Sequence, residues 1–202
     1  MNTGNSVDFF DRQFRQQVER QDFQLNPFEQ EVLPHLRGRV LDFGCGLGNL
    51  AMAAAAQGCP VVALDASPAA IAALRRRAQA AVLPAEATID AIEADLRHYP
   101  VDGDFDCVVS IGLLAFFDCA TALRVLAMLQ DRVRRDGIVA INTLIEGTSY
   151  LDMFGTAERC LFARDELPGR FAGWEILHSE FGDFDAPGNT LKSFVTLIAR
   201  KP

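Results

Sequence analysis

Short apolar runs alternate with helix-forming segments from residue 39 onward, and this alternation limits the chain to few folds. The runs are apolar along nearly their whole length instead of at every second position, which is typical of parallel strands that are buried on both faces. A parallel sheet with helices on both sides follows from this pattern. The expected strands are residues 39–43, 60–65, 87–95, 105–112 and 138–145, and the expected helices between them are 49–58, 67–81, with Ser67 as N-cap and Pro68 at its first position, and 120–137, which ends at a glycine.

The C-terminal tail departs from this alternation. After a short helix over 163–171, the runs 174–184 and 191–200 have strand composition and are joined by the turn-forming residues 185–189, "DAPGN". This pattern predicts an antiparallel hairpin at the end of the sheet. The predicted fold class is therefore α/β, a doubly wound and mostly parallel sheet of seven strands that ends in an antiparallel hairpin.

The length of 202 residues, half of them apolar, fits one structural domain. Within it we expect an N-terminal helical cap segment at 1–38 and a main domain at 39–202. The segment 7–36 has helical character and is rich in phenylalanine. We expect it to pack over the ends of the strands through Phe9, Phe10, Phe14, Phe23 and Phe28.

Composition excludes several classes of partner. The formal net charge of -8 argues against a nucleic-acid backbone as main partner, and the densest basic run, Arg75 to Arg77, is expected on a solvated helix face. The apolar run 50–56 is far too short to span a membrane, and no cationic leader precedes an apolar stretch. Five dispersed cysteines without a Cys-x-x-Cys pair suggest neither a disulfide framework nor a zinc site. We therefore expect a cytoplasmic protein without membrane contact, kept in a reducing compartment.

Three glycines, Gly44, Gly46 and Gly48, stand where the first strand turns into its helix. In a doubly wound sheet this turn exposes main-chain N–H groups to a ligand, and residues without Cβ allow close approach. A dinucleotide site would place its third glycine at position 49, but Asn49 stands there. The spacing instead favours an adenosyl amino acid. Asp65, at the end of the second strand, is placed to accept hydrogen bonds from ribose hydroxyls.

The stretch "VLDFGCGLGNLAMAAAAQGCPVVALDASPAAI" resembles the first and second motifs of class I S-adenosylmethionine-dependent methyltransferases. "EADLRHYP" resembles their third motif and "FDCVVSIGLLAFF" their fourth. The tail from residue 160 is similar in layout to that of tellurite-resistance and thiopurine methyltransferases. The resemblance implies a Rossmann-like fold, S-adenosyl-L-methionine as cofactor and methyl transfer as activity.

The resemblance also implies roles for residues at matching positions. The main chain from Gly44 to Gly48 and the side chain of Asp42 would face the methionine part, and Cys45 within this turn needs no redox role. Asp65 would hold the ribose. The adenine would lie beside Ala66, Asp95 and Leu96, and the floor near the sulfonium would be formed by Ser110, Ile111, Gly112 and Leu113.

No catalytic residue is assigned, because a sulfonium donor is already activated and the protein has mainly to align the reactants. The acceptor is expected to be a small molecule and not a nucleic acid, since no Asn/Asp-Pro-Pro-aromatic sequence follows residue 110. Tellurite-type enzymes carry a histidine and arginines in the final hairpin, whereas this chain has the acidic and aromatic "FGDFDAPGN", which favours a neutral or cationic acceptor. Candidates for the acceptor pocket are Phe116, Phe117, Asn142, Thr143, Tyr150, Asp152, Phe154, Arg12 and Arg15.

Two other functions stay open from the sequence. One is a nicotinamide-dependent oxidoreductase that would bind NAD across the same strand ends, although Asn49 and the absence of a Tyr-x-x-x-Lys pair disfavour it. The other is a protein that binds S-adenosylmethionine without catalysis. The glycine turn does not separate this possibility from an enzyme.

Overall fold

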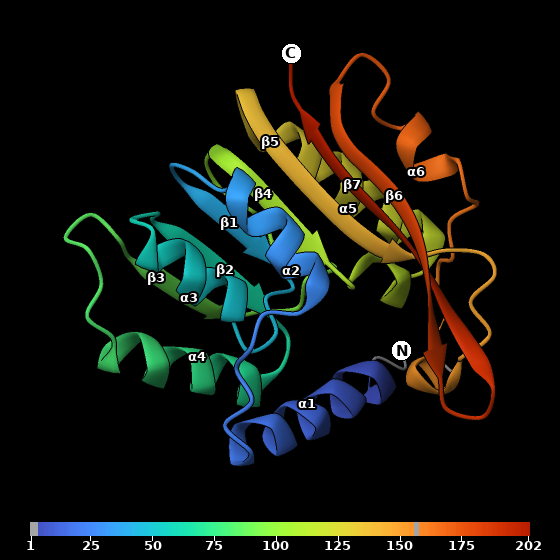
Figure 1. Cartoon of the computed structure of the whole chain (residues 1–202), viewed down its shortest axis with the longest axis horizontal. Coiled ribbons are helices and arrows are strands. Elements are labelled where there is room, and N and C mark those ends of the chain that lie inside the picture. Colours follow the sequence, from blue (N-terminus) through green and yellow to red (C-terminus); the bar gives the residue numbers. More distant parts are fainter. Residues whose placement is uncertain (1–3, 156–157) are drawn as a thin grey trace.

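One seven-stranded sheet runs through the molecule (Figure 1). The computed structural model describes residues 4–155 and 158–202, so the first three residues of the expected cap lie outside it. The strands stand in the order β3-β2-β1-β4-β5-β7-β6; neighbours from β3 to β5 are parallel, and β7 is antiparallel to both β5 and β6. This confirms the predicted fold class. The strands are β1 (Val40–Phe43), β2 (Val61–Asp65), β3 (Ile89–Glu93), β4 (Phe105–Ile111), β5 (Val133–Leu144), β6 (Glu175–Ala186) and β7 (Thr190–Arg200).

Helices cover both faces of this sheet (Figure 1). Within the described ranges no helix has the length and apolar character needed to cross a membrane. Ser67 caps its helix as expected, since its side chain accepts a hydrogen bond from the backbone N–H of Ala70 at 3.2 Å. The α-helices are α1 (Gly4–Glu19), α2 (Pro27–Val32), α3 (Asn49–Ala56), α4 (Pro68–Ala80), α5 (Cys119–Asp131) and α6 (Glu166–Gly169), and short 3-10 turns occupy Leu33–His35, Leu114–Phe116 and Asp152–Phe154.

The sheet is buried on both faces, as the near-continuous apolar runs predict. Within β1, Val40 packs into one hydrophobic cluster with Leu50 of α3, whereas Leu41 and Phe43 belong to a second cluster with Leu126 of α5. Because successive side chains of a strand point to opposite faces, the two clusters lie on opposite sides of the sheet. Because β1, β2 and β4 are parallel, their carboxyl ends lie at the same edge of the sheet, between the two layers of helices.

The prediction of a helix over 120–137 is wrong for its last third, residues 132–137. α5 ends at Asp131, and β5 begins at Val133, which pairs with Phe105 of β4. Gly137 lies within β5 and accepts a hydrogen bond from the backbone N–H of Lys201 at 2.9 Å. The charged sequence of residues 133–137 by itself favours a helix. Pairing with β4 and with Lys201 after β7 holds these residues in a strand instead, so tertiary contacts override local propensity. The helix expected over 163–171 is likewise shorter and covers only Glu166–Gly169.

Two of the three arginines expected on a solvated helix face bind the protein itself. Arg75 donates to the carbonyl of Ala91 from Nε at 3.0 Å and from Nη2 at 2.7 Å. Arg77 donates from Nη1 to the carbonyl of Leu47 and to Oδ1 of Asn49, both at 2.8 Å. Arg75 therefore holds α4 against β3, and Arg77 holds it against the glycine turn.

α1 lies beyond the carboxyl ends of the central strands and is fixed to α4 (Figure 1). Its Asp11 accepts hydrogen bonds from the Ser67 hydroxyl at 2.6 Å and from the Ala69 backbone N–H at 3.0 Å. Burial raises the pKa of Asp11, but these bonds and Arg15, 2.8 Å away, outweigh burial and hold the pKa below its usual value. Asp11 is thus a second cap for α4, supplied from another helix.

We expect Asp11→Ala to lower the free energy of unfolding by about 1 kcal/mol, the usual effect of losing a helix cap. Because the folded-state pKa of Asp11 is lowered, this contribution is present above its ordinary pKa and is lost as the pH falls below it. Urea unfolding at neutral pH measures the difference. The control is Glu19→Ala, an exposed acid at the end of the same helix; equal losses in both variants would contradict the capping role.

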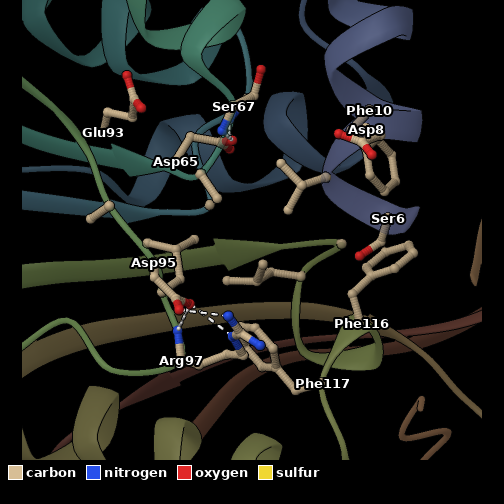
Figure 2. Close-up of a pocket in the computed structure, with 18 of the residues that line it drawn as sticks. Ser6, Asp8, Phe10, Asp65, Ser67, Glu93, Asp95, Arg97, Phe116 and Phe117 are labelled. Carbon is tan, nitrogen blue, oxygen red and sulfur yellow. Dashed lines mark hydrogen bonds and ion pairs between the residues drawn. The ribbon is translucent and has the colours of Figure 1, made fainter. Parts of the chain in front are cut away.

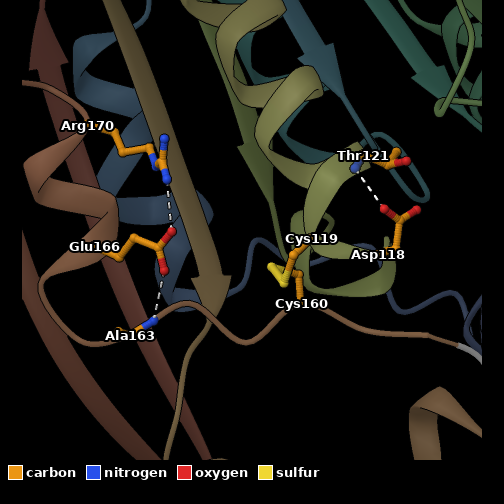
Figure 3. The surroundings of a disulfide bond; sticks show 7 residues. All are labelled: Asp118, Cys119, Thr121, Cys160, Ala163, Glu166 and Arg170. Atoms are coloured by element: carbon orange, nitrogen blue, oxygen red, sulfur yellow. Dashed lines mark hydrogen bonds and ion pairs between the residues drawn. A yellow bond between two sulfur atoms is a disulfide. The ribbon is translucent and has the colours of Figure 1, made fainter.

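A disulfide joins Cys119, the first residue of α5, to Cys160, which lies between β5 and α6 (Figure 3). The two cysteines are 41 residues apart in sequence, with Cα atoms 4.7 Å apart, and the Cys160 backbone N–H donates to the Ala115 carbonyl at 3.1 Å. The prediction that the cysteines carry no disulfide is therefore wrong. The spacing of the cysteines in the sequence does not indicate this pair, because Cys119 and Cys160 come together only where the chain returns after β5.

Thiol titration of the denatured protein checks this pair. We expect three reactive thiols without reductant, from Cys45, Cys59 and Cys107, and five after reduction. Five thiols before reduction, in protein purified without reductant, would contradict the disulfide.

Candidate functional site

A cavity of about 980 Å³ lies where the carboxyl ends of β1, β2, β3 and β4 meet α1. Its size is at the upper end of the range of small-molecule sites, about 300–1,000 Å³. Nine of the residues predicted from the sequence to contact the cofactor line it: Gly44, Gly46, Asp65, Ala66, Asp95, Leu96, Ile111, Gly112 and Leu113. Ligands of open α/β sheets bind at this edge.

The glycine turn presents bare main chain to this cavity. Gly44 and Gly46 have φ angles of 89° and 53°, in the left-handed region that L side chains rarely adopt. A Cβ on Gly46 would stand 3.1 Å from the ring of Phe14 on α1, and one on Gly44 would stand 3.0 Å from Leu113. Side chains at either position would narrow the cavity.

Gly48 has a structural role distinct from that of the other two glycines. It is buried, is the N-cap of α3 and does not line the cavity. A Cβ at this position would stand 2.5 Å from the Leu74 side chain, so glycine lets α4 pack against the start of α3. Asn49, where a dinucleotide fingerprint needs its third glycine, donates to the Gln24 carbonyl at 3.1 Å and is bound by Arg77.

Asp65 links the glycine turn to the start of α4. Its Oδ2 accepts from the Gly46 backbone N–H at 2.7 Å, and its Oδ1 accepts from the Ser67 backbone N–H at 2.9 Å. Burial raises its pKa, while these main-chain donors act in the opposite direction. The carboxylate is thus held in one orientation at the wall of the cavity, and Figure 2 shows it beside Ser67.

Asp42 lies behind the turn and not at the cavity surface. Its side chain is buried, with 4% of the residue exposed, and Oδ2 has no hydrogen-bond partner among the described residues. Burial, together with the charges of Glu29 and Asp65, raises its pKa to about 8. Cys45 is also buried, and burial raises the pKa of its thiol, which leaves it an unreactive core residue.

The third motif forms the wall that Figure 2 shows around Asp95 and Arg97. Arg97 Nη2 lies 2.6 Å from Asp95 Oδ2, and this hydrogen-bonded cation holds the pKa of Asp95 below its usual value. Leu96 is buried beside them. Ser110, expected in the floor, is fully buried, does not line the cavity, and its hydroxyl has no partner among the described residues.

The acceptor-pocket candidates divide into two groups. Phe116 and Phe117 line the cavity, and Phe117 also belongs to the core. Asn142 is buried and donates to Thr196 Oγ1 at 3.0 Å, and Tyr150 packs near Phe154 and under Lys192, whose Nζ is 5.0 Å from the Tyr150 ring centroid. The second group, which does not line the cavity, is Asn142, Thr143, Tyr150, Asp152, Phe154, Arg12 and Arg15.

Several cavity residues were not predicted from the sequence. α1 contributes Ser6, Val7, Asp8, Phe10 and Phe14 to the wall. The phenylalanines of this segment indicated that it packs over the strand ends, but their pattern does not tell which of them face a cavity. The remaining ones are Ser67, Glu93, Ala94, Arg97, Asp118 and Glu158.

Residues 40–137 match the family model described as "Methyltransferase domain". The chain is 29% identical over 170 residues to the protein named Hemagglutinin 1 of Eikenella corrodens, a stretch that is 81% of this chain and 55% of that protein. The chain thus spans about half the length of this curated relative.

Two solved structures share the fold over most of this chain. TehB from Haemophilus influenzae superposes with a TM-score of 0.75 at 19% identity, over 88% of this chain and 63% of that one. The N-methyltransferase NodS from Bradyrhizobium japonicum WM9, in complex with S-adenosyl-L-homocysteine, superposes with a TM-score of 0.68 at 15% identity, over 98% of this chain and 99% of that one. The family match therefore identifies residues 40–137 as a methyltransferase domain, and the sheet order and the glycine turn at the carboxyl end of β1 agree with the fold of these two solved structures.

Proposed function

We propose that this protein transfers a methyl group from S-adenosyl-L-methionine to a small-molecule acceptor. The observation that carries the proposal is the Asp65 carboxylate, held by the Gly46 and Ser67 main chain at the wall of a cavity that the glycine turn also lines. A carboxylate in this place can accept hydrogen bonds from two ribose hydroxyls. The left-handed Gly44 and Gly46 leave open the space that side chains would fill.

The cofactor, when bound, supplies a methyl group on a positively charged sulfur. The residues of this chain would orient it: Asp65 at the ribose, Ala66 and Leu96 beside the adenine, and Asp95 at its amino group. Ile111, Gly112 and Leu113 would form the floor under the methyl group. Asp42 is buried behind the glycine turn, its Oδ2 has no hydrogen-bond partner among the described residues, and its expected role at the methionine part stays a prediction.

The protein's contribution to the rate would be alignment and exclusion of water. α1 closes the cavity from the side opposite the strands, and its Phe10 and Phe14 present apolar rings there. In this proposal residues 1–38 serve as a cap on the main domain at 39–202. We extend the proposal to a cytoplasmic location. The disulfide between Cys119 and Cys160 argues against the reducing compartment expected from the sequence, so cell fractionation tests this extension.

A non-catalytic S-adenosylmethionine-binding protein is the second candidate. The cavity volume disfavours it, because about 980 Å³ leaves room for another small molecule beside the cofactor. A nicotinamide-dependent oxidoreductase is less consistent still, since Asn49 is bound by Arg77 and Gln24 where a dinucleotide site needs a bare main chain.

The test is transfer of labelled methyl from S-adenosylmethionine to a panel of small molecules that carry thiol, amine, hydroxyl or oxyanion acceptors. We expect label in at least one acceptor class and equal amounts of S-adenosylhomocysteine. Cofactor binding without transfer to any class would favour the non-catalytic alternative. Absence of cofactor binding would contradict both.

A further inference from the structure

The charge of the cavity wall is strongly one-sided. Among the described residues that line the cavity, Arg97 is the sole cationic side chain, and it is bound to Asp95 at 2.6 Å. Asp118 caps α5 by accepting from the Thr121 backbone N–H at 2.9 Å, a bond that holds its pKa below the usual value. The carboxylates on the wall are those of Asp8, Asp65, Glu93, Asp95, Asp118 and Glu158.

Two of the aromatic rings that line the cavity, Phe10 and Phe116, lie across it from Asp65 and Asp95 (Figure 2). The Phe10 and Phe116 rings meet edge to face with centroids 4.9 Å apart, and Phe154 lies behind Phe116 at 4.9 Å. Figure 2 shows Asp8 and Ser6 on this same side, next to Phe10 and Phe116 and across the cavity from Asp65 and Asp95. Acid and ring faces therefore border the same space, where an acceptor would meet the methyl group.

We propose that the acceptor is an amine, bound with its nitrogen between Asp8 and the Phe10 and Phe116 rings. This inference rests on the proposed methyl transfer and names its substrate class. Carboxylates and ring faces together attract a cationic or incipiently cationic nitrogen. The same wall repels thiolates, carboxylates and oxyanions.

The reaction chemistry agrees with this placement. An amine that binds as its ammonium first releases a proton to solvent or to a carboxylate of the wall. The lone pair of the neutral amine then attacks the methyl carbon, the carbon–sulfur bond breaks, and its electron pair stays on sulfur as the neutral thioether of S-adenosylhomocysteine. Positive charge thus moves from sulfur to nitrogen, toward Asp8. The new ammonium then releases a proton to solvent or to a carboxylate of the wall. Acids on the acceptor side stabilise the charge that develops in the transition state.

The experiment compares acceptors and variants in parallel. The panel contains alkyl amines that carry an aromatic ring. Each is matched with the thiol and the carboxylate that have the same phenylalkyl group, for example phenethylamine, 2-phenylethanethiol and 3-phenylpropanoate. We expect methyl transfer to amines only. Asp8→Asn should lower kcat/KM for the best amine about tenfold, in line with losing one close charge interaction. S-adenosylhomocysteine affinity should stay unchanged in this variant.

Two matched controls separate the site from general effects. Glu19→Gln removes one exposed acid from the same helix, and Phe184→Leu removes an exposed ring from β6, as a control for Phe116→Leu. Both controls should keep the wild-type kcat/KM, while Phe116→Leu should lower it. Transfer to thiols or oxyanions but to no amine, or equal rates for Asp8→Asn and Glu19→Gln, would overturn the amine assignment and leave the methyltransferase proposal standing. Failure of S-adenosylhomocysteine to bind the wild type would instead overturn the proposed function.

Discussion

Asp65→Ala is expected to weaken binding of S-adenosylhomocysteine by about 1–3 kcal/mol, which is roughly 5- to 150-fold in Kd. Two effects add in this variant. The ribose hydroxyls lose their acceptor, and the Gly46 and Ser67 backbone N–H groups lose theirs, so the glycine turn is less well fixed. Isothermal calorimetry on the purified protein measures the change directly.

Asp90→Ala is the matched control, since Asp90 is an exposed aspartate of β3, the strand beside β2, and does not line the cavity. We expect it to bind with wild-type affinity. An Asp65→Ala protein that is folded by circular dichroism and binds S-adenosylhomocysteine as tightly as this control would remove Asp65 from the site.

Asp42→Asn is expected to raise the free energy of unfolding of the ligand-free protein more at about pH 8 than at about pH 4. The difference between the two pH values should be roughly 2–5 kcal/mol. Burial first, and then the charges of Glu29 and Asp65, raise the folded-state pKa of Asp42 to about 8. A group with a raised carboxyl pKa binds more protons in the folded than in the unfolded state, so stability falls as pH rises from the ordinary pKa of about 4 to about 8. Asparagine stays neutral and abolishes this loss.

Urea unfolding of wild type and variant across that pH range measures the effect. The difference in unfolding free energy should grow from about pH 4 upward and level off above about pH 8. A difference that does not change with pH would show that Asp42 is ionised in the folded protein at neutral pH, contrary to the protonated form expected here.

Much of the fold could be predicted because local patterns and tertiary packing agree. The apolar runs before Gly44 and before Ala66 are continuous since β1 and β2 are buried on both faces, and the turn residues 187–189 join β6 to β7 as their composition indicates. Where two elements compete for the same residues, pattern is insufficient. Residues 133–137 became strand because β4 and the chain after β7 offer hydrogen-bond partners that no local window contains.

Only those site residues that belong to a sequence motif could be predicted. The glycine turn and Asp65 lie on adjacent strand ends, and their spacing follows from the fold. Asp8 and Phe10 come from a helix whose docking depends on Asp11 reaching Ser67, a contact between residues 56 apart in sequence. The disulfide has the same origin, because Cys119 and Cys160 meet only after the chain has passed through β5.

The most direct test of the central claim is a pair of calorimetric titrations of the unmodified protein, one with S-adenosylhomocysteine and one with NAD. If the main chain at Gly44–Gly48 and the Asp65 carboxylate form an adenosyl amino acid site, S-adenosylhomocysteine binds at one site per chain and NAD gives no heat of binding. Tight binding of NAD, or no binding of S-adenosylhomocysteine, would contradict it.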